Sequence, residues 1–237
     1  MKGLIIKTHL QQISDCYTGM KQTKDYDRKV IKMKTVLCYG DSNTYGYNPR
    51  TGFRYPEDIR WTGLLQKALE KDALILEEGL CGRTTVFDDD TIAGANGLNA
   101  LPAVLEADSP FDLAIIMLGT NDCKCVFGAS AQEITDGLEL CLAKILEVID
   151  PENVLLISPL YLSDAALGYG YDDRSLAVSR ELKQKYRELA DRYGTAFLAA
   201  SDVASASGVD GQHLTAEGHR ALFEAVLNII TPKVRSL

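Results

Sequence analysis

The chain has 237 residues, of which 46% are hydrophobic and 24% charged, and its formal net charge is −8. These are ordinary values for a globular protein, and the length suits one domain with a sizeable core. The negative charge argues against nucleic acid and anionic membrane surfaces as partners. No apolar run approaches the roughly 20 residues that cross a bilayer, so we expect no membrane insertion, and we expect no secretory signal in the first residues. Six cysteines do not make a disulfide framework in a chain this long, so we expect a cytoplasmic location.

The first 33 residues differ in composition from the rest of the chain. They mix Lys, Gln, Thr and Asp without a sustained period. We interpret residues 1–33 as an N-terminal extension, either an extended start or a tail that orders only against a partner. Residues 34–237 are then the folded domain.

From Thr35 onward, short apolar runs alternate with longer helical patterns. The runs predict strands at 35–39, 73–77, 113–118, 154–157 and 196–198, and the patterns predict helices at 61–71, 131–149, 173–192 and 215–230. Strands that alternate with helices imply right-handed crossovers and a parallel sheet between two helical layers. The sequence therefore predicts an α/β fold, a three-layer α/β/α sandwich with a five-stranded parallel sheet.

Four loops contain residues whose types are not explained by solvent exposure alone. They are the loop with Ser42, the loop 77–85, the loop 119–122 directly after the most hydrophobic strand, and the loop 210–215 before the last helix. In a doubly wound sheet the carboxyl ends of adjacent strands lie close together, so these loops can converge on one crevice.

The residue types in these loops suit nucleophilic catalysis. A serine hydroxyl such as that of Ser42 is a poor nucleophile until a base takes its proton, and His213 can be that base. Asp210 precedes His213 by three residues, a spacing that lets a turn bring the carboxylate to the imidazole. The backbone N–H groups of Ser42 and Gly82 and the side-chain amide of Asn121 are candidate donors to a developing oxyanion.

Each of these residues also has a structural explanation. Ser42 can be a helix cap or a turn residue, Gly82 can serve only a turn, and Asn121 can cap the next helix. Asp210 can simply shape its loop, and His213 can be a hydrogen-bonded loop histidine. Their joint presence in separate loops favours the chemical explanation.

The ordered motifs resemble the four sequence blocks of the SGNH hydrolases, also known as GDSL-type esterases and lipases. The matching segments are Gly40-Asp41-Ser42-Asn43-Thr44, Gly82, Gly119-Thr120-Asn121-Asp122 and Asp210-x-x-His213. The segments 57–63, 77–85 and 115–124 look more narrowly like the bacterial arylesterase and acyltransferase branch. The resemblance extends from about Lys34 to the C-terminus.

The resemblance implies a flavodoxin-like SGNH hydrolase fold. It also implies a serine ester hydrolase whose substrate is a small molecule, either a small carboxylic ester or an aryl ester. It implies Ser42, His213 and Asp210 as catalytic triad, and Ser42, Gly82 and Asn121 as oxyanion hole. It further implies an acyl-enzyme released to water, or to an alcohol or peroxide, with no cofactor and no metal. Relatives in this branch form homo-oligomers that narrow the site entrance, so we expect a homo-oligomer. The position of Asn43 commonly holds Leu in the family, and we expect it at the mouth of the site.

Four residues near these motifs are candidate substrate contacts. They are Asp41, Asn43, Trp61 and Lys124. Trp61 can wall an acyl pocket or belong to the core. We expect His219 to be a packed helix residue, and Arg83 to be either a substrate contact or a solvated charge.

Other functions remain open from the sequence. A deacetylase for acetylated sugars would share the same triad. A non-catalytic flavodoxin-like binding module would use the same fold without the chemistry. A metal-dependent hydrolase would use His213 with the acidic run 88–90, which is otherwise a solvated loop.

Overall fold

The structure is a computed structural model that describes residues 33–107 and 110–235. Residues 33–237 form one structural unit. Apart from Met33, the predicted N-terminal extension over residues 1–33 lies outside the described residues.

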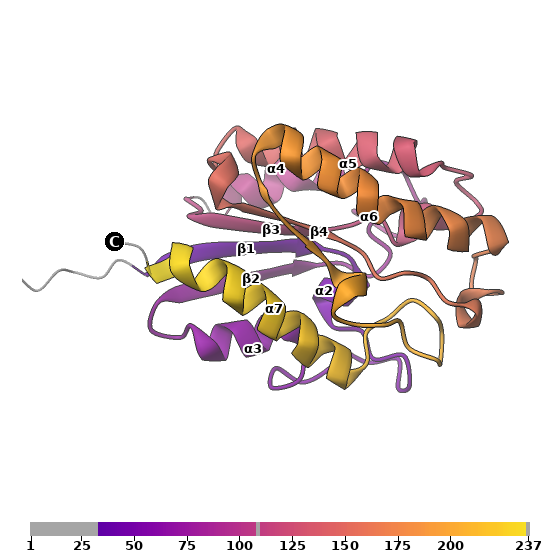
Figure 1. Cartoon of the computed structure of the whole chain (residues 1–237), viewed down its shortest axis with the longest axis horizontal. Helices are drawn as coiled ribbons and strands as arrows, with labels where there is room; N and C mark the ends of the chain where they lie inside the picture. The colour runs from indigo at the N-terminus through magenta and orange to yellow at the C-terminus, as the bar shows by residue number, and fades with distance from the viewer. Residues whose placement is uncertain (1–32, 108–109, 236–237) are drawn as a thin grey trace, which may run out of the picture. The chain divides into compact units, whose positions relative to one another are not determined.

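The described residues form a sheet of five parallel strands in the order β2-β1-β3-β4-β5 (Figure 1). The strands are β1 (Lys34–Gly40), β2 (Ala73–Gly79), β3 (Leu113–Met117), β4 (Val154–Ser158) and β5 (Ala196–Ala199). Every residue of the central strand β3 is buried, as expected for a parallel strand covered on both faces. The predicted five-stranded parallel sheet is confirmed.

Two helical layers cover the sheet (Figure 1). The helices α4 (Gly97–Ala107), α5 (Ala131–Leu146) and α6 (Asp173–Tyr193) pack on one face, and α3 (Trp61–Ala68) and α7 (Ala216–Arg235) pack on the other. Side chains alternate along a strand, so Leu37 and Tyr39 of β1 enter the first core while Val36 and Cys38 enter the second. The predicted three-layer α/β/α sandwich is confirmed.

Local signals define where the long helices begin. A capping box begins α5, in which the Ser130 hydroxyl accepts from the Glu133 N–H and the Glu133 carboxylate accepts from the Ser130 N–H. Asp172 and Ser175 make the same arrangement at the start of α6. Gly194 ends α6 in the left-handed conformation, with a φ of 73°.

The sequence patterns missed two helices. The helix α4 contains Pro102 and begins with Gly97, two residues that normally argue against a helix interior, yet Leu101 is fully buried in the first core. The helix α2 (Ser42–Tyr45) has only four residues, too few for a period to show. The last helix also continues to Arg235, beyond the predicted end at residue 230.

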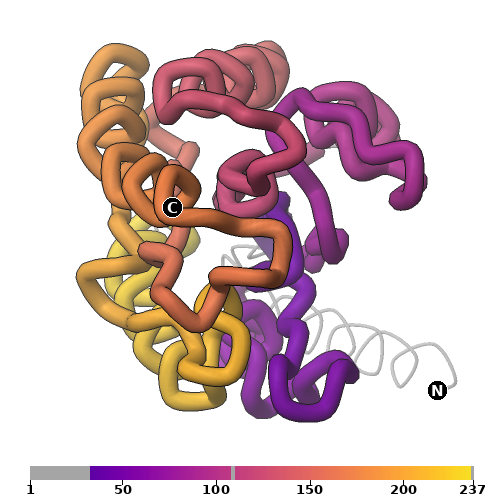
Figure 2. The backbone as a smooth tube through the Cα atoms, turned by 90° about the vertical axis from the view of Figure 1, so that its right-hand side faces the viewer, coloured from indigo at the N-terminus to yellow at the C-terminus, as the bar shows by residue number. Residues whose placement is uncertain are grey.

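The strand order places a crevice beside the end of β1. The chain runs from β1 to β2 on one side and then to β3 on the other, which makes the β1–β3 boundary the switch point where open α/β sheets bind ligands. Gly40 at the end of β1 pairs with Gly79 of β2 and Met117 of β3, so the three strands end level with one another. The loops that follow them therefore lie side by side on the face turned to the viewer in Figure 2.

None of the helices within the described ranges has both the length and the apolarity that crossing a membrane requires.

Candidate active site

Ser42 is the first residue of α2, immediately after β1. The carboxylate of Asp41 caps this short helix by accepting a hydrogen bond from the Asn43 N–H at 2.9 Å, and Gly46 ends it with a φ of 85°. A Cβ on Gly40 would lie 2.1 Å from the Thr44 hydroxyl oxygen, so only glycine fits the sharp turn from strand to helix. The turn displays Ser42 at the end of the sheet.

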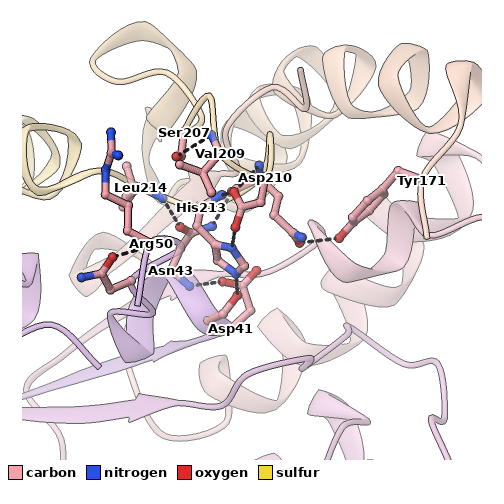
Figure 3. Close-up of polar contacts among 12 residues, drawn as sticks. Asp41, Asn43, Arg50, Tyr171, Ser207, Val209, Asp210, His213 and Leu214 are labelled. Atoms are coloured by element: carbon pink, nitrogen blue, oxygen red, sulfur yellow. Dashed lines mark hydrogen bonds and ion pairs between the residues drawn. The ribbon is translucent and has the colours of Figure 1, made fainter. Parts of the chain in front are cut away.

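Ser42, His213 and Asp210 form a hydrogen-bonded chain, of which Figure 3 labels His213 and Asp210. The distance from Ser42 Oγ to His213 Nε2 is 2.9 Å, and the distance from His213 Nδ1 to Asp210 Oδ2 is 2.6 Å. All three residues are buried. The structure thus brings together three side chains that the sequence places in two distant loops, in the order that general-base activation of a serine requires.

Asp210 is held as an anion beside the imidazole. Its Oδ1 accepts from the backbone N–H of Gln212 at 3.3 Å and of His213 at 3.2 Å, which leaves Oδ2 for the ring. Burial alone would raise the pKa of Asp210, but the hydrogen bond and charge of His213 and the two backbone donors hold the pKa below its ordinary value. An ionised carboxylate at this place can stabilise an imidazolium on His213.

The loop that carries His213 is fixed by its own contacts. The Ser207 N–H donates to the His213 carbonyl at 2.7 Å, and Gly211 has a φ of 69° with no room for a Cβ, which would lie 2.2 Å from the Ala166 nitrogen. Tyr47 packs its ring against the imidazole, with 4.5 Å between ring centroids. Nothing in the local pattern around Tyr47 points to a histidine so far along the chain, so this contact could not be predicted from the sequence.

Gly82 and Asn121 follow β2 and β3 and contact each other's loops. The Asn121 side-chain amide donates to the Arg83 carbonyl at 3.0 Å, which occupies one of its two amide hydrogens and leaves the other. Gly82 has a φ of 86°, and a Cβ there would lie 2.3 Å from Cδ1 of Ile92. Within the described ranges the N–H groups of Ser42 and Gly82 donate to no acceptor, so both are available to an anion.

Asp122 makes a second tie between the same two loops. Its Oδ1 accepts from the Thr85 N–H at 2.8 Å and from the Thr85 hydroxyl at 2.5 Å. Burial raises the pKa of this fully buried carboxyl to about 6, against the lowering effect of the Thr85 hydrogen bonds. No local sequence signal indicates this role, in which the aspartate holds the loop of Gly82 against that of Asn121.

Three of the four candidate substrate contacts face the protein interior. Trp61 is fully buried and donates from Nε1 to the Asn43 carbonyl at 3.0 Å, so it belongs to the core and does not wall an acyl pocket. Asn43 is also buried, and both polar atoms of its amide bind the His213 loop, which corrects its expected place at the mouth. Asp41 is buried as the cap of α2. Lys124 is half-buried at the end of the short helix η1 (Asn121–Cys123), and its contact with substrate stays a prediction.

Two further titratable residues serve the fold. Buried Arg83 donates to the Gly40 carbonyl at 3.0 Å and to the Glu78 carbonyl, and its guanidinium lies 4.2 Å from the centroid of the Tyr39 ring. It therefore joins the ends of β1 and β2. His219 is fully buried in α7, as expected of a packed helix residue, and burial, with the charges of His213 and Arg60, lowers its pKa to about 3.

The acidic run 88–90 is engaged in its own loop. Asp88 accepts from the Asn96 amide at 3.0 Å, and Asp89 accepts from the Thr91 N–H at 3.0 Å. In the part of the chain that the structure describes, no cluster of three or more His, Cys, Asp or Glu residues could hold a metal ion. The five cysteines in that part are free thiols.

The comparison with known families agrees with this architecture. Residues 38–221 match the model of the GDSL-like lipase/acylhydrolase family. The chain belongs to this family. It is a carboxylic ester hydrolase, and the predicted SGNH hydrolase fold is confirmed.

The solved structures similar to this esterase include proteins named for two different activities. A carbohydrate acetylesterase family member from Sinorhizobium meliloti is 36% identical over 85% of this chain and 99% of that chain, with a TM-score of 0.78. An aryl esterase from M. smegmatis is 34% identical over 84% of this chain and 98% of that chain, with a TM-score of 0.77. No curated protein matches the chain. The two solved structures are about equally similar, so similarity alone does not choose between their substrates.

Proposed function

We propose that this esterase cleaves small or aryl carboxylic esters through an acyl-enzyme on Ser42. The observation that carries the proposal is the chain of hydrogen bonds from Ser42 Oγ to His213 Nε2 at 2.9 Å and from His213 Nδ1 to Asp210 Oδ2 at 2.6 Å. Ser42 Oγ attacks the ester carbonyl carbon while its proton passes to His213 Nε2, and Asp210 orients the ring and stabilises its positive charge. His213 then protonates the leaving alkoxide, and the carbon–oxygen bond of the ester breaks.

The second half of the reaction repeats these steps with water. His213 takes a proton from water, the hydroxide oxygen attacks the acyl carbon, and Ser42 leaves with the proton returned by His213. The N–H groups of Ser42 and Gly82 and the free hydrogen of the Asn121 amide stabilise the oxyanion in both halves. Each such donor typically contributes about 2.7–4 kcal/mol to lowering the barrier. No step uses a metal or a cofactor.

Replacing Ser42 tests the proposal directly. S42A removes the attacking oxygen, and we expect turnover of p-nitrophenyl acetate to fall by more than about 10³-fold while circular dichroism and the melting temperature stay the same. A fluorophosphonate probe should label the parent protein on Ser42 and leave S42A unlabelled. Full turnover by S42A would reject the mechanism, and an unlabelled, inactive parent protein would favour a non-catalytic binding module.

Deacetylation of acetylated sugars is the second candidate function. The carbohydrate acetylesterase family member from Sinorhizobium meliloti favours it, since it is as similar to this chain as the aryl esterase is. The same triad serves both reactions, so the substrate decides. Rates on acetylated saccharides measured beside rates on aryl acetates distinguish the two. Acyl transfer to alcohols or peroxide and assembly into a homo-oligomer stay predictions.

A further inference from the structure

The side-chain amide of Asn43 binds the backbone on both sides of His213. Its Oδ1 accepts from the Leu214 N–H at 2.8 Å, and its Nδ2 donates to the Gln212 carbonyl at 3.1 Å. Figure 3 shows Asn43 and Leu214 beside the imidazole. One amide therefore brackets the histidine with two hydrogen bonds to the residues before and after it.

This bracket joins two segments that are 171 positions apart in the sequence. Asn43 directly follows Ser42 in α2, so the bracket ties the backbone that carries the hydroxyl to the backbone that carries the imidazole. Asn43 is itself held, because its N–H donates to the Asp41 cap at 2.9 Å and its carbonyl accepts from Trp61 Nε1 at 3.0 Å. The backbone of Asn43 is therefore held on both sides, which fixes the position from which its amide binds the His213 loop.

The other contacts of the loop do not replace this link. The hydrogen bonds from Ser207 to His213 and from Gln212 and His213 to Asp210 lie within the loop and fix its shape. Tyr47 packs against one face of the His213 ring, and this contact does not fix the distance between the ring and Ser42. Among the described residues, the hydrogen bonds that join this loop to α2 are those of Asn43 and the Ser42–His213 pair itself.

We propose that Asn43 is a positioning residue that keeps His213 Nε2 within hydrogen-bond reach of Ser42 Oγ. The proposal rests on the function proposed above. Asn43 is only 3% exposed, so an apolar side chain there would leave the Gln212 carbonyl and the Leu214 N–H without partners in a buried place. The loop would shift to find new partners, and a displacement of about 1 Å at a reacting group can lower the rate by about 10²-fold.

Three variants test this positioning role. N43L has a similar volume and lacks the amide. N43D keeps an acceptor for the Leu214 N–H, but sets a carboxylate oxygen against the Gln212 carbonyl. T44V is the matched control, because Thr44 is the next residue of α2, is 1% exposed, and has a hydroxyl without a partner among the described residues.

The measurements are kcat and KM on p-nitrophenyl acetate, the rate of labelling by a fluorophosphonate, and the melting temperature. For N43L we expect kcat and the labelling rate to fall by about 10²-fold while KM changes by less than about threefold. T44V should keep the parent rates within about twofold. In N43D, activity should decline as pH rises, because the new carboxyl ionises next to the Gln212 carbonyl oxygen. The pH–rate profile of the parent protein should not show this decline.

Each alternative result has a distinct meaning. An unchanged kcat with a raised KM in N43L would place Asn43 against the substrate and overturn the proposal. Parent-like rates in N43L would show that the bracket is not needed. If N43L does not fold, the pH profile of N43D decides, and a parent-like profile overturns the proposal. Activity in S42A would instead reject the proposed function, whatever the Asn43 variants do.

Discussion

We expect the stability of this esterase to depend on pH through the buried imidazole of His219. Burial and the nearby charges of His213 and Arg60 lower the pKa of His219 to about 3 from an ordinary value of 6.5. Its Nδ1 accepts from the Trp61 N–H at 3.3 Å, so the neutral ring carries its proton on Nε2. Between pH 6.5 and 3 the unfolded chain therefore binds a proton that the folded protein does not, and stability falls as pH falls.

The size of the effect follows from the two pKa values. Linkage gives a loss of about 2 kcal/mol of unfolding free energy between pH 7 and pH 5, and about 3 kcal/mol between pH 7 and pH 4. The carboxyl of Asp122 acts in the opposite direction, because its raised pKa of about 6 makes the folded protein bind the extra proton between pH 6 and pH 4. A comparison of two variants that both keep Asp122 cancels that contribution.

Urea unfolding of the parent protein and of H219Q at pH 7 and pH 5 isolates the histidine. The glutamine side chain can accept the Trp61 N–H and does not titrate, so we expect H219Q to lose about 2 kcal/mol less than the parent protein on acidification. Equal urea m-values would show that the unfolded states are comparable. An equal loss of unfolding free energy in both proteins between pH 7 and pH 5 would show that His219 is not the source of the pH dependence.

Three further predictions concern the proposed oxyanion site and the expected independence of the reaction from metal ions. N121A should lower kcat on p-nitrophenyl acetate by about 10²–10³-fold with little change in KM, and an unchanged kcat would remove Asn121 from the oxyanion hole. G82A should lower the free energy of unfolding by about 1–2 kcal/mol, since alanine must adopt a φ of 86°, and it should also lower kcat; a parent-like urea midpoint would contradict this. EDTA should leave the rate unchanged, and a loss that zinc or calcium restores would support a metal-dependent hydrolase instead.

The sheet and the hydrogen-bonded chain at its edge could be predicted from the sequence. The strands are continuous apolar runs bounded by glycine or polar residues, and the long helices show their period over several turns. Ser42, Asp210 and His213 could be grouped because each follows or precedes a strand or helix end, and in a parallel sheet such ends share one edge. In the structure these three side chains lie within hydrogen-bond distance of one another along the chain Ser42–His213–Asp210.

The supporting contacts could not be predicted, because tertiary packing decides them. Asn43 and Trp61 sit in polar or amphipathic patterns that suit a site mouth as well as a core. Trp61 is buried in the core that α3 shares with α7, and Asn43 is buried where its amide binds the loop that carries His213. The tie from Asp122 to Thr85 joins residues 37 positions apart, and no local signal in either loop indicates it. The helix α4 forms in spite of Pro102, because packing of Leu101 outweighs its weak propensity.

The ties that join the loops of Gly82 and Asn121 have a consequence for inhibitors. With Asn121 bound to the Arg83 carbonyl and Asp122 bound to Thr85, the groups of the proposed oxyanion hole are held in place by the protein's own contacts. A boronic acid that mimics the tetrahedral intermediate then has little conformational entropy to remove from the protein as it docks. Its association should follow a single exponential phase, with a rate proportional to inhibitor concentration and no slow tightening step afterwards.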